Sequence, residues 1–314
     1  MDDQTTAGHN QVDALPRAVD RPMSGIQERA AKQRREWHHV LLLTPAVLWV
    51  LFAVLVPVAM IVWVSFRRMK GGLLEPALTI ENWTTALSQG ITWTLVFRTL
   101  WTTGVVLVIV AALGLTAGYF LSRFVKKPRT QALLLMLAIL PFWTSYIIRI
   151  VTWQPLLGER GVLNWTLVRL GIINEPSSAF LFNQGVMMFA MVSLYVVFVI
   201  GPVYWAFGTI SPDVVAAARS LGATPWKAFW TVELPLAKGG LVAGSFFAAI
   251  FLFGDYATER LIGGGTHPAL AGTVKAYAGY GQWPAASALG VLLIVMVFLV
   301  LGLFMKFHNL RREL

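Results

Sequence analysis

The residues best placed to do chemistry in this sequence are carboxylates and aromatic side chains that fall inside apolar stretches. Asp255 and Glu259 are four residues apart in such a stretch, and this spacing predicts that both lie on one helix face. A charge near the bilayer centre costs roughly 2.5–3.5 kcal/mol, so carboxylates in a span are expected to face protein or water. A paired acidic face suits a solute with ammonium groups spaced along an apolar chain. Tyr256, Trp143 and Tyr146 could add cation–π contacts of about 0.5–2 kcal/mol.

A structural interpretation of the same residues stays open. Asp255 could pair with Arg149, and Glu259 and Arg260 could sit at the outer membrane interface. Aromatic residues near helix ends are commonly interface anchors.

Catalytic patterns are missing from the sequence. The chain has no Cys, no HExxH motif and no G-x-S-x-G elbow, and its five His are scattered. No Lys follows a Gly, which excludes a Gly-Lys-Ser/Thr phosphate-binding loop, and the glycines at 263–265 are typical of a turn. We therefore expect no catalytic residue, metal site or cofactor in this chain, and any ATP hydrolysis must occur in another subunit.

The composition predicts an all-α polytopic membrane protein. Of the 314 residues, 57% are hydrophobic and 13% are charged, whereas soluble domains carry about 25% charged residues. Apolar stretches near the ~20 residues that a bilayer requires predict six transmembrane helices, at 40–64, 101–122, 131–152, 186–207, 241–262 and 285–307. The second could begin earlier, because residues 93–98 are also largely apolar.

The distribution of positive charge predicts the orientation. Sixteen of the 25 Lys and Arg residues fall in the N-terminal segment, the loop after the second span, the loop at 211–238 and the C-terminal tail. By the positive-inside rule these segments, and both termini, are assigned to the cytoplasm. Arg67, Arg68 and Lys70 fall on the opposite side. The net charge of +10 is explained by this rule rather than by nucleic-acid binding.

Residues 211–238 read as a folded element rather than a plain loop. Ser211 is a suitable helix cap before Pro212, and Gly222 is suited to the left-handed position after a helix. Thr224 and Pro225 repeat the cap-then-proline pattern, and Pro235 is expected to end the second helix near Val232.

This two-helix element carries more apolar surface than it can bury on itself. Part of the surface is expected to pack under the spans, and part could dock into a partner's groove. Trp226 and Trp230 are expected to be packing residues rather than partner contacts.

These residues resemble the "EAA" loop of binding-protein-dependent ABC importer permeases. That pattern has Glu-Ala-Ala, three residues, Gly, nine residues, an aliphatic residue, any residue and Leu-Pro. The matching positions, with the neighbour of the glycine, are Ala216, Ala217, Ala218, Gly222, Ala223, Val232, Leu234 and Pro235. Ala216 departs from the usual Glu, which removes one polar contact to the ATPase subunit but leaves the docking surface. In that family this coupling segment seats in a groove of the cytoplasmic ATPase.

The resemblance covers about residues 90–305 and implies a MetI-like, type I ABC importer transmembrane domain. It implies a multi-pass inner-membrane subunit that contacts lipid, and three kinds of partner: an ATP-binding subunit dimer that holds ATP and Mg, a second homologous permease and an external substrate-binding protein. Within the family, "LPFWTSYIIRIVTW", "GVLNWTL" and "GDYATERLIGG" resemble the spermidine/putrescine permease subgroup, which implies a polyamine substrate. The expected organisation is a cytoplasmic tail, a first transmembrane helix, a permease domain containing the coupling segment and a second cytoplasmic tail, at 1–39, 40–64, 65–307 and 308–314.

Two alternatives remain open. Opine, iron and related permeases share parts of these motifs, so the substrate could be an opine, an amino-acid derivative or iron. A stand-alone channel or ion-coupled transporter would show inverted repeats with paired broken helices, and the sequence has no such symmetry. A membrane-embedded enzyme would need a convergent catalytic set.

Overall fold

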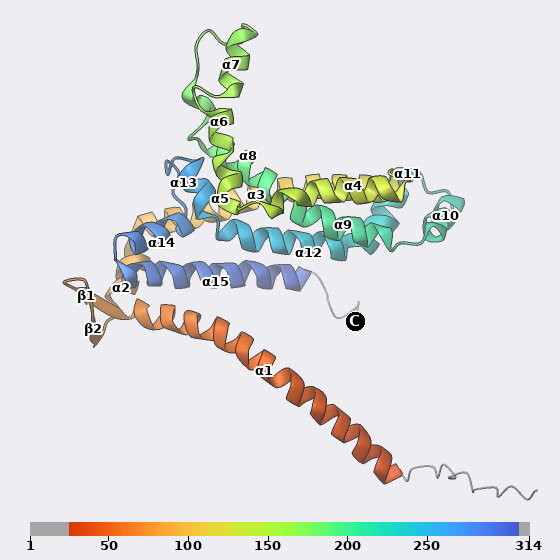
Figure 1. The fold of residues 1–314 in the computed structure, drawn as a ribbon, viewed down its shortest axis with the longest axis horizontal. Helices are drawn as coiled ribbons and strands as arrows, with labels where there is room; N and C mark the ends of the chain where they lie inside the picture. The colour runs from red at the N-terminus through yellow and green to blue at the C-terminus, as the bar shows by residue number, and fades with distance from the viewer. Residues whose placement is uncertain (1–24, 308–314) are drawn as a thin grey trace, which may run out of the picture. The chain divides into compact units, whose positions relative to one another are not determined.

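The computed structural model describes residues 25–307, which are mostly α-helical (Figure 1). Residues 1–24 and 308–314, which belong to the predicted tails, lie outside the described residues. The chain divides into two compact units, residues 1–58 and 59–314.

Helix α1 runs from Gly25 to Ser65, so it contains the first predicted span and begins within the predicted cytoplasmic tail. Its stretch Val47–Ser65 is long and apolar enough to cross a membrane. Within the first unit, large apolar side chains such as Trp49 and Phe52 are exposed. Exposed apolar side chains on a helix of this length are typical of a span that is covered by lipid or by other helices.

The core of the second unit is built from α3 (Gly90–Arg123), α9 (Val197–Gly208) and α12 (Leu234–Phe253), which pack tightly on one another. A Cβ added to Gly114 would lie 2.5 Å from Val199 Cβ, and one added to Gly244 would lie 2.7 Å from Val199 Cα. Small residues at these crossings let the backbones approach closely, as helix association in membranes requires.

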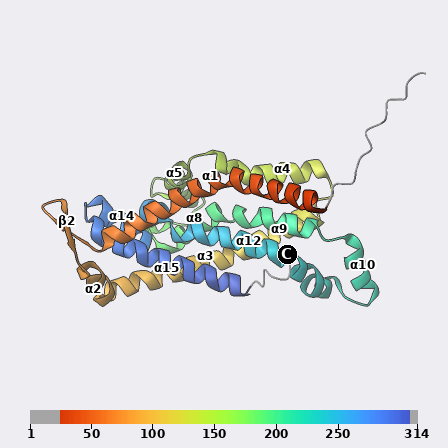
Figure 2. The same cartoon turned by 90° about the horizontal axis from the view of Figure 1, so that it is seen from below.

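Helices α4 (Pro128–Ile139), α8 (Gln184–Tyr195) and α15 (Trp283–Phe307) complete the bundle (Figure 2). Five helices in the described residues are long and apolar enough to cross a membrane, or up to seven if each of two bent pairs counts as a span. The six predicted spans fall within this range. The second span begins at Gly90, and the fourth consists of α8 and α9, separated at Val196.

The third predicted span, 131–152, is wrong as a continuous helix. After α4 the chain forms a 3₁₀ turn at Leu140–Trp143, and Thr144 and Ser145 are then extended. The helices before and after this break differ in direction by 100°. Pro141 has no N–H to donate to the preceding turn, and its carbonyl ends the 3₁₀ turn by accepting from the Thr144 hydroxyl at 2.6 Å and the Thr144 N–H at 3.2 Å.

The bundle ends differ in character (Figures 1 and 2). One end carries α10 (Pro212–Ser220) and α11 (Pro225–Ala228). The opposite end carries short elements, namely β1 (Arg67–Lys70), β2 (Leu73–Leu78), α2 (Glu81–Ser88), α13 (Tyr256–Leu261) and α14 (Leu270–Gly279). Strands β1 and β2 form an antiparallel hairpin that pairs Lys70 with Leu73 and Arg67 with Leu78.

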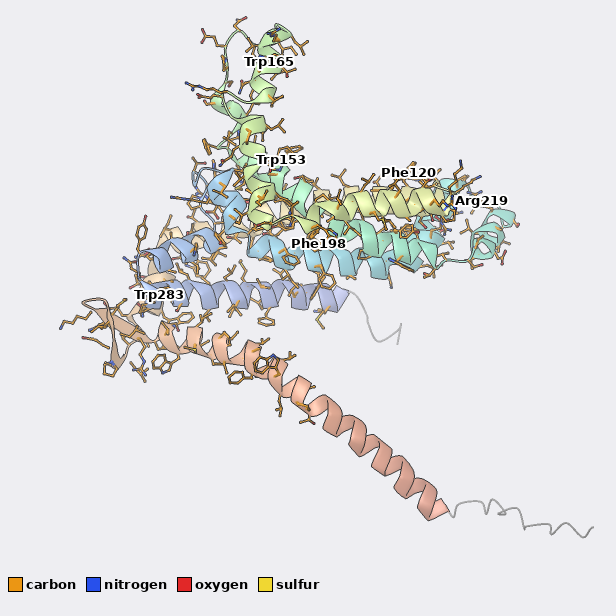
Figure 3. All side chains as sticks on the ribbon, in the orientation of Figure 1. Phe120, Trp153, Trp165, Phe198, Arg219 and Trp283 are labelled. Atoms are coloured by element: carbon orange, nitrogen blue, oxygen red, sulfur yellow. The ribbon has the colours of Figure 1, made fainter. Side chains whose placement is uncertain are left out.

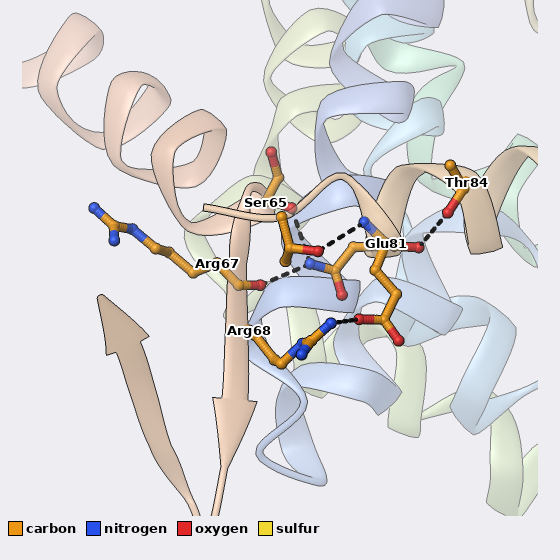
Figure 4. Close-up of polar contacts among 7 residues, drawn as sticks. Ser65, Arg67, Arg68, Glu81 and Thr84 are labelled. Atoms are coloured by element: carbon orange, nitrogen blue, oxygen red, sulfur yellow. Dashed lines mark hydrogen bonds and ion pairs between the residues drawn. The ribbon is translucent and has the colours of Figure 1, made fainter. Parts of the chain in front are cut away.

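The hairpin gives a structural role to Arg67 and Arg68, which fall on the non-cytoplasmic side in the predicted orientation. Arg68 forms an ion pair with Glu81 at 2.5 Å (Figure 4). The Arg67 guanidinium lies 4.1 Å from the centre of the Trp63 ring. Asn82 Nδ2 donates to the carbonyls of Ser65 and Arg67 at 3.0 and 2.7 Å. Both arginines thus help to fasten the end of α1 to α2.

An arm projects from the bundle and carries Trp165 near its tip (Figure 3). It contains a series of short helices, α5 (Tyr146–Val151), α6 (Trp153–Leu157), α7 (Val162–Arg169) and the 3₁₀ turn Ser178–Phe180. The fully buried Asn164 ties α7 to the segments before and after it. Its side chain donates to the Gly158 and Ser177 carbonyls and accepts from the Ser177 N–H at 2.7 Å.

Candidate functional site

Local capping forms the coupling segment as the sequence predicts. Ser211 Oγ accepts a hydrogen bond from the Asp213 N–H at 3.2 Å, and Pro212 occupies the first turn of α10. Thr224 Oγ1 accepts from the Lys227 N–H at 3.2 Å at the start of α11. Each cap satisfies one of the backbone donors that a helix start leaves unpaired.

Gly222 makes the turn between these two helices. Its φ is +87°, in the left-handed region, and a Cβ there would meet nothing within 4 Å. The Ala223 N–H donates to the Ala218 carbonyl at 3.1 Å, the long bond of a Schellman-type helix end. The prediction that Gly222 follows a helix in the left-handed conformation is confirmed.

The prediction that Pro235 ends the second helix is wrong. Residues Phe229–Glu233 form a π-helical turn, and α12 continues directly from Leu234. Proline lacks an N–H and its ring crowds the carbonyl four residues earlier, so the wider π turn lets the chain pass without a stop. Residues 225–253 therefore form one helical rod.

The coupling segment exposes an apolar surface. Leu221 is 90% exposed and Trp226 is 71% exposed, and Trp230 and Val214 are also exposed. Trp226 and Trp230 contact each other and the Phe229 ring, with ring centres 5.3–6.2 Å apart, and both remain exposed. The expectation that they are packing residues rather than partner contacts stays a prediction. Of the remaining motif positions, Ala216, Ala217 and Pro235 are exposed and Ala218, Ala223, Val232 and Leu234 are half-buried. An apolar surface on a capped, rigid turn is suited to docking into a partner's groove.

The base of the segment is anchored in the bundle. Phe229 packs on Tyr119 and Phe207, with ring centres 4.9 and 6.2 Å away. In the π turn, the buried Glu233 lies 3.7 Å from the Arg123 guanidinium, at the end of α3. Sequence reasoning missed this ion pair. The available signal was an acidic residue directly before Leu-Pro, in a stretch that is otherwise apolar.

At the other end of the rod, Asp255 is a helix cap rather than a residue of span five. Helix α12 ends at Phe253, and Asp255 Oδ1 accepts from the Thr258 N–H at 2.9 Å to begin α13. The predicted fifth span through residue 262, and its shared face with Glu259, are therefore wrong. The buried Asp255 carboxylate also accepts from the Tyr146 hydroxyl and, at 2.9 Å, from the Tyr195 hydroxyl.

These groups border a cavity of about 470 Å³. Besides Asp255, polar and charged groups in its wall come from Tyr146, Tyr195 and Arg149, and aromatic rings from Phe142, Phe198 and Phe251. Among the residues that the structure describes, Arg149 makes no ion pair with Asp255, so that structural alternative is not observed. A carboxylate surrounded by aromatic rings is a suitable environment for an organic cation.

The other predicted pathway residues lie elsewhere. Trp143 is 87% exposed, and Tyr256 and Glu259 border a separate cavity of about 500 Å³. The Glu259 carboxylate lies against the start of α14, facing the N–H groups of Ala269 and Gly272. A Cβ on Gly272 would come 2.2 Å from Glu259 Oε1. Glu259 thus supports the fold of α14, and of the predicted set only Tyr146 joins Asp255.

A bundle of long apolar helices with a broken span and an exposed, capped turn is the fold of a polytopic membrane protein. The chain belongs to the family described as binding-protein-dependent transport system inner membrane component, whose pattern matches residues 112–313. It is thus a multi-pass inner-membrane permease subunit of an ABC importer, a transporter component and not an enzyme.

Named relatives agree with this assignment. The chain is 30% identical over 264 residues to the spermidine/putrescine transport system permease protein PotB of Haemophilus influenzae, covering 83% of this chain and 91% of that protein. It is 27% identical over 266 residues to PotB of Escherichia coli, covering 83% and 94%. The fold resembles that of a bacterial ABC transporter involved in the import of the acidic polysaccharide alginate, with a TM-score of 0.66, 17% identity and coverage of 89% and 99%. A second structure, of a bacterial alginate ABC transporter in complex with its alginate pentasaccharide-bound periplasmic protein, gives a TM-score of 0.68 at 15% identity, with coverage of 86% and 94%.

Proposed function

We propose that this chain forms the translocation pathway for a polyamine such as spermidine or putrescine. The observation that carries the proposal is the Asp255 carboxylate in a cavity walled by aromatic rings. Relatives named as spermidine/putrescine permeases, at 26–30% identity over most of the chain, support the same substrate class.

The hydrogen bonds of Asp255 leave room for a cation. A carboxylate offers about four acceptor positions, and three are used by the Tyr146 and Tyr195 hydroxyls and the Thr258 N–H. The remaining position can accept an ammonium group. The rings of Phe198 and Phe251 can pack against the methylene groups between the nitrogens or contact a second ammonium.

Asp255→Asn tests the pathway assignment. Asparagine caps helices about as well as aspartate, so α13 is expected to survive while the negative charge is lost. Hydrogen bonds to charged groups contribute about 1.5–3 kcal/mol, which predicts an uptake loss of about ten- to a hundredfold at low spermidine concentration. Uptake would be measured in membrane vesicles that contain the whole importer, with the amount of assembled complex quantified in parallel.

The matched control is Glu159→Gln, which removes an exposed carboxylate from the arm. Equal uptake by the Asp255 and Glu159 variants would remove Asp255 from the pathway. A wild-type importer that takes up an opine or an iron chelate, but no polyamine, would instead refute the substrate.

We further propose that a separate ATPase dimer drives this subunit through residues 211–238. The exposed Leu221 and Trp226 supply the apolar surface, and the helical rod 225–253 supplies a continuous connection into the bundle. The coupling segment and both termini would then face the cytoplasm, and ATP and Mg would be bound by the ATPase.

The remaining partners in the proposal are a second homologous permease and an external substrate-binding protein. The family description names dependence on a binding protein, and a structural relative was solved with its periplasmic protein bound. Such a protein would meet the end of the bundle opposite α10, where the hairpin and the short helices lie (Figure 2).

A further inference from the structure

Among the residues that the structure describes, Arg149 is the one cationic side chain in the wall of the Asp255 cavity, and the proposed function gives it no role. It lies three residues after Tyr146 on α5, so the two side chains share a helix face. Arg149 also borders a second cavity of about 420 Å³, on the side of Thr152 and Leu194. Its guanidinium therefore stands between two open spaces rather than in a packed core.

The guanidinium is held by an aromatic ring and not by a carboxylate. Its Cζ lies 4.6 Å from the centre of the Phe142 ring, and its Nε is buried with no hydrogen-bond partner. Asp255, in the same cavity wall, is engaged by Tyr146 and Tyr195 and keeps one acceptor position unused. A cation and an anion therefore border one cavity without pairing.

We propose that Arg149 is a resident cation that opposes binding of the substrate's ammonium group in the Asp255 cavity. The inference rests on the proposed polyamine pathway. Arg149 stays on the Phe142 ring, where it covers part of the aromatic wall and its charge disfavours a second cation at the Asp255 carboxylate. This opposition keeps the permease's affinity low, which a pathway needs because bound solute must also be released.

This role makes Arg149 a determinant of affinity and not a substrate ligand. A purely structural arginine would affect assembly, whereas a cation that opposes binding affects binding and release in opposite directions. Removing the charge should tighten binding of spermidine and slow its delivery. An arginine that binds an anionic group of some other substrate would give the opposite result, since its removal would weaken binding.

The test compares Arg149→Gln and Arg149→Lys with Arg169→Gln in the complete importer. Arg169 is a matched control, because it also lies over an aromatic ring, Trp165 at 4.8 Å, but is exposed on the arm. Equilibrium binding of spermidine to the purified permease–ATPase complex without binding protein gives the affinity. Uptake at saturating binding protein in proteoliposomes gives the maximal rate.

The expected result is that Arg149→Gln binds spermidine about tenfold tighter than wild type and has a lower maximal uptake rate. Arg149→Lys and Arg169→Gln should stay within about twofold of wild type. If Arg149→Gln does not assemble, Arg149→Met gives the same measurement, because it removes the charge and keeps an apolar stem.

Unchanged or weaker binding by the charge-removing variants would overturn the inference. So would equal tightening by Arg149→Lys, since that variant retains a cation. If the wild-type importer transports spermidine and the Arg149 variants behave like the Arg169 control, only this inference fails. If the wild-type importer transports no polyamine, the proposed function fails and the inference fails with it.

Discussion

Replacing Gly222 by valine is expected to uncouple the permease from its ATPase. Gly222 has a φ of +87° and open space around its Cα, so an added side chain meets no neighbouring atom. The whole effect must therefore come from the backbone conformation. For L-residues the left-handed conformation costs roughly 1–2 kcal/mol, and a β-branched side chain is among the least tolerant of it.

The strain acts between the two halves of the docking surface. Leu221 and Trp226 lie on either side of Gly222, and the turn is closed by bonds from the Gly222 and Ala223 N–H groups, at 2.9 and 3.1 Å. A cost of 1.4 kcal/mol is a tenfold change in an equilibrium. The native turn should thus become about 5- to 30-fold less populated relative to open forms, and ATPase association should weaken by a similar factor.

The assay is co-purification of the ATPase with the permease, together with spermidine uptake, at equal permease content in the membrane. Gly222→Asn should be close to wild type because asparagine tolerates the left-handed conformation, and Gly222→Ala should be intermediate. Gly171→Val is the matched control: it has a φ of +70° and open space, but lies on the arm. It should leave ATPase association unchanged. Full association and uptake by Gly222→Val would refute the coupling role of this turn.

Three further substitutions test the supporting structure through the thermal unfolding of the purified complex. Glu233→Gln leaves Arg123 without its counter-charge and should destabilise the subunit by up to about 3 kcal/mol; an unchanged midpoint would show that the pair carries no stability. Gly244→Ala places a methyl group 2.7 Å from the α9 backbone and should cost about 1–3 kcal/mol, whereas Gly208→Ala meets open space and should be neutral. Asn164→Ala breaks three buried hydrogen bonds and should cost about 1–3 kcal/mol, with faster proteolysis of the arm; protease resistance equal to wild type would contradict this.

The coupling segment could be predicted from the sequence because its determinants are local. Ser211 and Thr224 cap helices whose N–H groups lie two or three residues away, and Gly222 adopts the conformation that favours glycine. Each signal lies within a few residues of its effect, so a single sequence contains all the information needed. Most of the spans could be located for a related reason, because a long apolar stretch is itself the signal, although the breaks within them could not.

The polar break at Asp255 could not be predicted in the same way. Residues 255–262 mix Asp255, Glu259 and Arg260 with apolar residues, so the pattern alone does not decide between the end of the helix and an amphipathic continuation. The groups that hold Asp255 are Tyr195 and Tyr146, 60 and 109 residues away in the sequence. Nothing in the local sequence distinguishes these tyrosines from interface anchors. The spacing of four residues therefore predicts a pair of Asp255 and Glu259, whereas in the structure Glu259 supports α14.

The continuation of the helix through Pro235 joins the two candidate sites into one mechanical element. Residues 225–253 span about 43 Å at 1.5 Å per residue, from the exposed Trp226 to the break before Asp255. Figure 3 shows the separation of the two regions, with Arg219 on the coupling segment and Phe198 inside the bundle. The rod packs so closely along α9 that a Cβ at Gly240 or Gly244 would clash with α9. Such close packing leaves little room for the two helices to slide past each other, so the rod is expected to move as a unit. A displacement of the coupling segment would then shift the other end of the rod, and so change the hydrogen bonds that hold the Asp255 carboxylate.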